Sequence, residues 1–127
     1  MNARLQPQAM ALSRLLMAAM FIQSGLAKLG APDATRGYIE AMHLPGILVW
    51  PTIVFEIVAG VLIVVGFQTR IVALLLAAYC IVTAAIFHNH LGDQMQLINF
   101  MKNIAIAGGF LLLACVGPGP LSLDEKR

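Results

Sequence analysis

A carboxylate lies within the most apolar part of the sequence, the run PTIVFEIVAGVLIVVGF that begins at position 51. Nearly every neighbour of Glu56 in this run is aliphatic, aromatic or glycine. Placing an ionised side chain in hydrocarbon costs about 2.5–3.5 kcal/mol on insertion scales. A cation must offset that cost, and Lys28 and Lys102 are the two candidates. Two interpretations of Glu56 stay open: a catalytic acid or base, or an ion-pair partner that holds helices together.

Further residues that could bind a substrate or carry a proton stand near the ends of apolar runs. Ser24 and Lys28 come at the end of the first run, Lys102 and Asn103 at the start of the last, and all four side chains can donate hydrogen bonds. His88 is the last residue of the third run, and an imidazole ordinarily titrates near neutral pH. We therefore predict His88 as a second catalytic candidate and the four donors as substrate-binding candidates.

The letters HNH at positions 88–90 resemble a metal-binding motif, but their spacing does not support one. Residues i and i+2 of a helix do not share a face. Neither a cysteine nor a second acid accompanies the two histidines. We expect no metal site.

Arg14 is a second charge inside an apolar run, in the opposite half of that run from Lys28. At 1.5 Å per residue it lies about 7 Å from the end of the run. A long cationic side chain at that depth can extend to the membrane surface. We expect Arg14 to reach phosphate head groups.

The elements that must position these residues are four long apolar runs. The chain has 127 residues, of which 60% are hydrophobic and 11% charged. A soluble domain of this size cannot bury so much apolar surface, whereas a run of about 20 apolar residues spans a bilayer. The runs cover about 9–29, 48–67, 70–88 and 98–116. They predict one domain over 1–127: an all-α integral membrane four-helix bundle in a lipid bilayer.

The connection between the first two runs is long enough for a short helix. Pro32 and Asp33 suit a helix start, and Pro45 with Gly46 would end it. We expect this helix to lie at the membrane interface. The first run, although preceded by Arg4, is interrupted by a charge too early for a typical signal peptide, so we expect it to be an uncleaved helix.

Positive charge sets the orientation. With both termini in the cytoplasm, five cations fall on the inner half and three on the outer half. The inner set is Arg4, Arg14, Arg70, Lys126 and Arg127, and the outer set is Lys28, Arg36 and Lys102. In this orientation Glu56 lies about 7–8 Å inward from the outer end of its helix. The polar ends of all four helices then meet around it.

Composition excludes several classes of function. The net charge of +2 is small and scattered, so we expect no nucleic-acid partner. Cys80 and Cys115 lack the spacing of a redox pair, and we interpret both as small buried apolar residues.

Several of these stretches together resemble the DoxX family of small bacterial membrane proteins. They are RLLMAAMFIQSGLAKL, FEIVAGVLIVVGFQTR, FHNH and NFMKNIAIAGGFLLLACVGPGPLSLD. The resemblance implies a four-helix protein of the bacterial inner (plasma) membrane. The family is named for a subunit of thiosulfate:quinone oxidoreductase, so it also implies a link to quinone. Its pattern selects Arg14, Lys28, Glu56, His88, Lys102 and Asn103, which adds Arg14 to the substrate-binding candidates.

Three functions remain open. The first is a membrane subunit of a quinone-linked oxidoreductase, with quinone as the lipophilic substrate or cofactor. Its electrons would come from a redox partner protein or from a bound small reductant. The second is a non-catalytic membrane scaffold. The third is a small-anion transporter, which with four helices would need to oligomerise. Whether the chain itself catalyses a reaction, and whether it is an oligomer, stays open.

Overall fold

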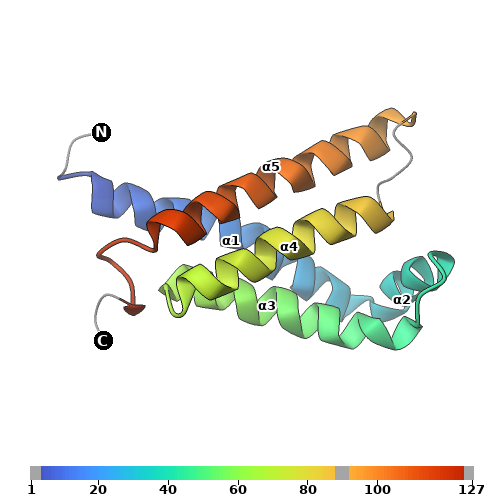
Figure 1. Ribbon diagram of the computed structural model, residues 1–127. Helices are drawn as coiled ribbons and strands as arrows, with labels where there is room; N and C mark the ends of the chain where they lie inside the picture. The colour runs from blue at the N-terminus through green and yellow to red at the C-terminus, as the bar shows by residue number, and fades with distance from the viewer. Residues whose placement is uncertain (1–3, 88–91, 125–127) are drawn as a thin grey trace.

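The computed structural model describes residues 4–87 and 92–124. Its elements are α1 (Gln6–Gly30), α2 (Pro32–Ala41), a 3-10 turn η1 (Gly46–Leu48), α3 (Val49–Val65), α4 (Thr69–Phe87) and α5 (Gln94–Val116). Within the described residues there is no strand (Figure 1), and the predicted all-α fold is confirmed. His88, Lys126 and Arg127 lie outside the described residues.

Four of the helical segments are long and apolar enough to cross a membrane. They are Gln6–Gly30, Gly46–Val65, Thr69–Phe87 and Gln94–Val116, with 25, 20, 19 and 23 residues. At 1.5 Å per residue the shortest spans about 29 Å, which matches a hydrocarbon core of about 30 Å. The chain is an integral membrane protein.

Two helix starts differ from the expected positions. α5 begins at Gln94, before the expected position 98, because the Asp93 carboxylate accepts hydrogen bonds from the backbone N–H groups of Met95 (2.9 Å) and Gln96 (3.5 Å). Such a cap satisfies donors that have no partner within the helix. α1 begins at Gln6, before position 9, with a proline in its first turn, where a missing N–H costs nothing.

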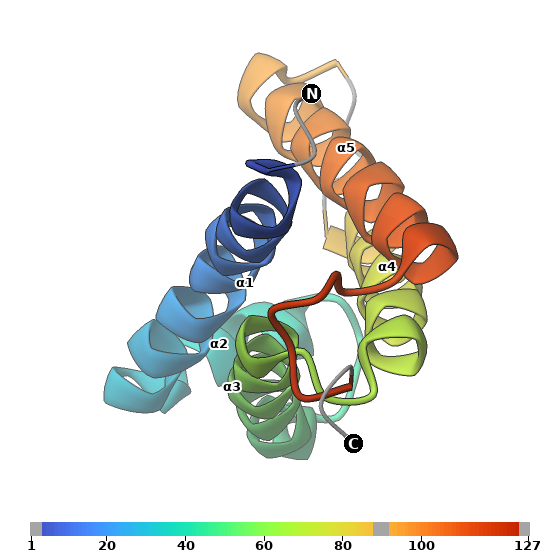
Figure 2. The same ribbon diagram turned by 90° about the vertical axis from the view of Figure 1, so that its left-hand side faces the viewer.

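The bundle consists of two closely packed helix pairs, α1 with α3 and α4 with α5 (Figure 2). Glycines let α1 and α3 approach. A Cβ atom on Gly60 would lie 2.6 Å from Ile22 Cγ1, and one on Gly25 would lie 2.5 Å from Ile57 Cγ1. The two pairs meet in a core that includes Phe21 of α1, whose ring makes an edge contact with Phe110 of α5 at 5.5 Å.

The end of the bundle that holds the α3–α4 turn is covered by residues 117–124. This segment returns over the turn, where the N–H groups of Leu123 and Asp124 donate to the carbonyls of Val65 and Gly66, each at 2.9 Å. The Asp124 carboxylate in turn accepts from the N–H groups of Gln68 and Thr69, at 2.8 and 2.9 Å. The segment therefore completes the first turn of α4.

Arg14 is buried at this same end, with 2% of its surface exposed. Its guanidinium donates to the carbonyls of Ile63 (3.1 Å) and Val64 (2.9 Å) in the last turn of α3, and to that of Leu121. Carbonyls at a helix end lack partners within the helix and attract a cation. The expectation that Arg14 reaches lipid head groups was wrong, because these carbonyls bind it inside the protein.

The short helix expected after the first span is α2. Pro32 is its first residue and Asp33 lies in its first turn. In Figure 1, α2 lies at the opposite end of the bundle from residues 117–124, beside the end of α1 and the start of α3. Its position at a membrane interface stays a prediction.

Candidate functional site

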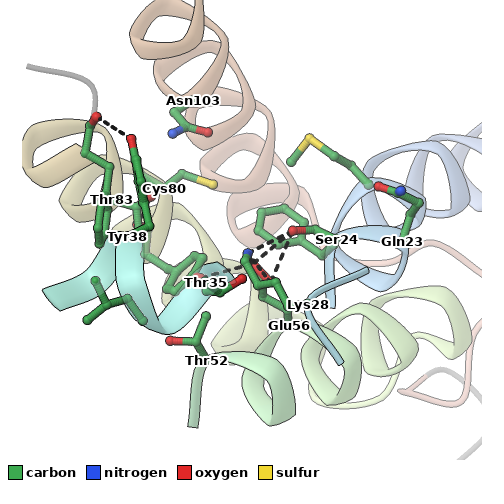
Figure 3. Close-up of a pocket in the computed structure, with 15 residues that line it drawn as sticks. Gln23, Ser24, Lys28, Thr35, Tyr38, Thr52, Glu56, Cys80, Thr83 and Asn103 are labelled. Atoms are coloured by element: carbon green, nitrogen blue, oxygen red, sulfur yellow. Dashed lines mark hydrogen bonds and ion pairs between the residues drawn. The ribbon is translucent and has the colours of Figure 1, made fainter. Parts of the chain in front are cut away.

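A pocket of about 410 Å³ lies at the α2 end of the bundle, and all five helices contribute to its wall. Its apolar wall includes Phe21, Ile39 and Phe87. Its polar wall consists of Gln23, Ser24 and Lys28 of α1, Thr35 and Tyr38 of α2, Thr52 and Glu56 of α3, Tyr79, Cys80 and Thr83 of α4, and Asn103 of α5 (Figure 3).

The Glu56 carboxylate forms an ion pair with Lys28 inside this pocket. The Lys28 ammonium lies 2.5 Å from Oε1 and 2.8 Å from Oε2, and it also donates to Ser24 Oγ at 2.9 Å. The Ser24 hydroxyl is 3.2 and 3.3 Å from the two carboxylate oxygens. Glu56 is 3% exposed and Lys28 26% exposed. The charge is therefore compensated where water is scarce, which is the condition for keeping a carboxylate at this depth.

Tyr79 of α4 also binds Glu56, although it is not among the predicted site residues. Its hydroxyl donates to Oε1 at 3.1 Å, and its ring contacts Phe21 and Phe55 at centroid distances of 6.2 and 5.0 Å. Depth could have identified it. Tyr79 lies about 12 Å from the Phe87 end of α4, and Glu56 about 10 Å from the start of α3, at the same end of the bundle. The residues predicted at this depth carry charged, amide or aliphatic hydroxyl groups, and none of them is a phenol.

An aromatic contact between α2 and α4 forms part of the pocket wall. The rings of Tyr38 and Phe87 are stacked with centroids 5.2 Å apart, and the Tyr38 hydroxyl donates to the Phe87 carbonyl at 3.1 Å. The contact ties the short helix to the bundle over the pocket.

The structure brings four of the predicted site residues to this pocket: Ser24, Lys28, Glu56 and Asn103. Lys102 is exposed and does not line the pocket, so Lys28 is the cation that pairs with Glu56. Arg14 lies at the other end of the bundle, against the end of α3. The structure therefore does not place Lys102 or Arg14 with the other candidates. His88 falls outside the described residues, directly after Phe87.

The cysteines occupy different environments. Cys80 is buried and lines the pocket, as expected of a small apolar side chain, whereas Cys115 is exposed on α5, which corrects the expectation for that residue. Among the described residues no group of three or more histidine, cysteine or acidic side chains could hold a metal ion.

The pocket combines a neutralised charge pair with hydroxyl and amide groups between apolar walls. Lys28 and Ser24 can share their donors between Glu56 and a ligand, and Thr83 and Asn103 offer further polar atoms. The carboxylate can accept a proton and the ammonium can supply one. Such a site can bind a polar head group with carbonyl or hydroxyl oxygens and move protons to or from it.

Comparisons with known proteins agree with the architecture. The family model for DoxX matches residues 9–89. "Inner membrane protein YqjF" of Escherichia coli is 39% identical over 122 residues, which cover 96% of this chain and 94% of that protein. "Inner membrane protein YphA" of the same organism is 38% identical over 95% of this chain and 91% of its own length.

A more distant relative comes from yeast. "ER-derived vesicles protein ERV29" of Saccharomyces cerevisiae is 31% identical over 83 residues, which cover 61% of this chain and 27% of that protein. No solved structure matches. The matched family model spans α1 to the end of α4 and so includes Lys28, Glu56 and Tyr79. With this match and two relatives aligned over nearly their full lengths, the chain belongs to the DoxX family.

Proposed function

We propose that this membrane protein is the quinone-binding subunit of a redox system in the bacterial inner membrane, and that the pocket around Glu56 holds the quinone head group. The observation that carries the proposal is the neutralised Lys28–Glu56 pair in the wall of a pocket of about 410 Å³, within a bundle whose long helices are apolar enough to cross a membrane. Ligand pockets in proteins have volumes of about 300–1,000 Å³.

The lining of the pocket fits such a head group. Aromatic side chains at Phe21 and Phe87 offer flat apolar walls to a ring, and ring contacts of this kind add to the energy of burial. The ammonium of Lys28 and the amide of Asn103 offer donors to the carbonyl oxygens of a quinone. Apolar walls with a few polar groups are typical of small-molecule sites.

Proton supply is the chemistry that the chain itself would provide. A bound quinone accepts two electrons and two protons when it becomes a quinol, and in this proposal the electrons come from a redox partner protein. Lys28 orients a carbonyl and stabilises developing negative charge, while Glu56, held by Tyr79 and Ser24, takes up and returns protons. Glu56→Gln should therefore abolish quinone turnover in the assembled system.

Binding can be tested without the partner. The protein would be purified in lipid nanodiscs, and the retained quinone would be quantified by mass spectrometry for wild type, Lys28→Gln and Lys102→Gln. The two substitutions remove the same charge, but only Lys28 lines the pocket. We expect near-stoichiometric quinone in wild type and Lys102→Gln and a large loss in Lys28→Gln. Equal retention by both variants would contradict the proposal.

A scaffold function has an observation of its own. Glu56 of α3 accepts hydrogen bonds from α1 and α4 together, so the same cluster joins three helices. A scaffold predicts that Lys28→Gln lowers stability to the same extent with and without added quinone. A quinone site predicts instead that added quinone raises the melting temperature of wild type and not of the variant, because only a state that binds ligand is stabilised by it.

A further inference from the structure

An apolar groove runs along the surface between α3 and α4. It consists of two hollows of about 420 and 380 Å³ that share Pro51, Phe55 and Leu75. From residue 51 to residue 62 the α3 side of the groove is about 16 Å long, roughly half the thickness of the hydrocarbon core. We name it the α3–α4 groove.

The α3–α4 groove adjoins the polar pocket. Thr52 of α3 and Tyr79 of α4 line both the pocket and the nearer hollow of the groove. In Figure 3, Thr52 and Asn103 lie on opposite sides of the Lys28–Glu56 pair. Thr52 and Tyr79 thus lie between the charged cluster and an apolar surface groove.

The lining changes in character from one end of this path to the other. Beside Thr52 the walls carry two hydroxyl groups, whereas the further hollow is lined by apolar side chains alone, among them Val58, Leu62 and Val72. A molecule with a polar head group and an apolar chain changes from polar to apolar in the same order. Each part of such a molecule would meet matching chemistry.

We infer that the α3–α4 groove holds the apolar chain of the ligand whose head group occupies the pocket, with Thr52 and Tyr79 forming the threshold between them. The inference rests on the proposed function and deepens it: the ligand is a single-chain amphiphile that enters sideways from the bilayer between α3 and α4. Lipid chains are as apolar as the groove, so the groove adds little affinity by hydrophobicity. Its role is to let the chain leave the pocket while the head stays bound.

Blocking the groove tests this directly. Ala78 lines the nearer hollow and is exposed, so Ala78→Phe places a ring in the groove without entering the core. Ala105→Phe makes the same change at an exposed position of α5 that lines none of the cavities described above. Two probes would be compared in nanodiscs at a fixed probe-to-lipid ratio: a dimethoxy-methyl-benzoquinone without a side chain, and the same ring with a decyl chain.

We expect Ala78→Phe to bind the chainless ring as wild type does and to bind the decyl probe about tenfold more weakly, since overfilling a packed space costs this much. Ala105→Phe should bind both probes normally. Equal binding of the decyl probe by Ala78→Phe and wild type would contradict the inferred role of the groove, but it would not contradict the head-group pocket. If wild type bound neither probe, the proposed function and the groove would both fail.

A photoreactive group at the end of the chain gives a test that needs no variant. Crosslinks should map to α3 and α4 around Val58, Leu62 and Val72. Crosslinks around Met20, Gln23 and Asn103 would place the exit between α1 and α5 and would overturn the inference.

Discussion

The Glu56 carboxylate accepts hydrogen bonds from an ammonium, an aliphatic hydroxyl and a phenol, supplied by Lys28, Ser24 and Tyr79. Three donors satisfy the acceptor sites of one buried carboxylate, which would be costly to leave without partners. Lys28 is one-quarter exposed, so the ammonium can turn toward a ligand at a smaller cost than Glu56 could. In this arrangement the acid is fixed and the lysine is the adaptable partner.

Removing one charge of this pair should lower the free energy of unfolding more than removing both. Glu56→Gln leaves the Lys28 ammonium without its counter-ion, and breaking a buried pair costs about 3–5 kcal/mol. Partial exposure of Lys28 places the expected loss near the low end of that range. The double variant Lys28→Gln/Glu56→Gln should recover much of the loss, because two amides can bond to each other. Thermal unfolding in detergent would measure both, and a single variant as stable as wild type would contradict this assignment.

The two tyrosines near the pocket allow a matched comparison. Tyr79→Phe removes a donor to a carboxylate, and hydrogen bonds to charged groups contribute about 1.5–3 kcal/mol. Tyr38→Phe removes a donor to a backbone carbonyl at an exposed position, where water can replace it. We expect Tyr79→Phe to lower the free energy of unfolding clearly and Tyr38→Phe to change it little. The reverse order would show that the α2–α4 contact is the more important one.

The depth of each residue along its helix predicts much of this cluster. The direction in which a side chain points around the helix axis could not be predicted from the sequence. Glu56, Lys28 and Ser24 were identified because residues at matching depth in antiparallel helices meet. Lys102 is at a suitable depth but faces outward. In a lipid environment both faces of a helix are apolar, so the sequence carries little signal for which face is buried. Arg14 was misplaced for a related reason, since its carbonyl partners include Leu121, far away in sequence.

The pairing of α1 with α3 depends on small residues more than on charge. Gly60 faces Ile22 and the backbone carbonyl of Ala18, and a Cβ atom there would lie 3.3 Å from that carbonyl oxygen. Close backbone approach through small residues is a principal source of helix association in membranes. The same approach brings Ser24 and Lys28 of α1 against Glu56, so the glycine contact and the ion pair depend on each other.

Gly60→Ala should therefore weaken the bundle. The added methyl group would press on Ile22 and on a backbone atom that cannot rotate away, and overpacking costs about 1–3 kcal/mol. Gly108→Ala is the control, because a Cβ atom there meets nothing within 4 Å, and alanine favours a helix over glycine by about 1 kcal/mol. Unfolding in detergent should show a loss for Gly60→Ala and no loss for Gly108→Ala. If Gly60→Ala left the free energy of unfolding unchanged, the close approach of α1 and α3 at Gly60 would not contribute to stability.

The four spans were predictable because apolar length is a strong signal, but their connections were less so. The cap at Asp93 and the short α2 depend on local residue types, and α2 was predicted from them. The return of residues 117–124 over the α3–α4 turn was not, because it depends on backbone contacts with Val65 and Gly66, which leave no periodic pattern in the sequence.

The two ends of the bundle differ in construction. At one end residues 117–124 and Arg14 close the helix termini by binding carbonyl groups, and Arg70 likewise donates to the carbonyls of Ala114 and Cys115 at 3.1 and 2.7 Å. At the other end a polar pocket lies under α2. A redox partner that exchanges electrons with a ligand in the pocket would have to approach from the pocket end. Orientation in the membrane therefore decides in which compartment that partner must be found.

Positive charge predicts that the closed end faces the cytoplasm, since Arg4, Arg14 and Arg70 lie there. A green fluorescent protein fused after the last residue should then be fluorescent, and alkaline phosphatase at the same position inactive, because each folds correctly in only one compartment. Substituting glutamine for Arg4 and Arg70 together should reduce the fluorescent fraction, whereas Lys102→Gln, on the outer half, should not. An active phosphatase fusion in the unaltered chain would show that the orientation is the opposite of the predicted one. The pocket would then face the cytoplasm, and the proposed electron donor would have to be cytoplasmic.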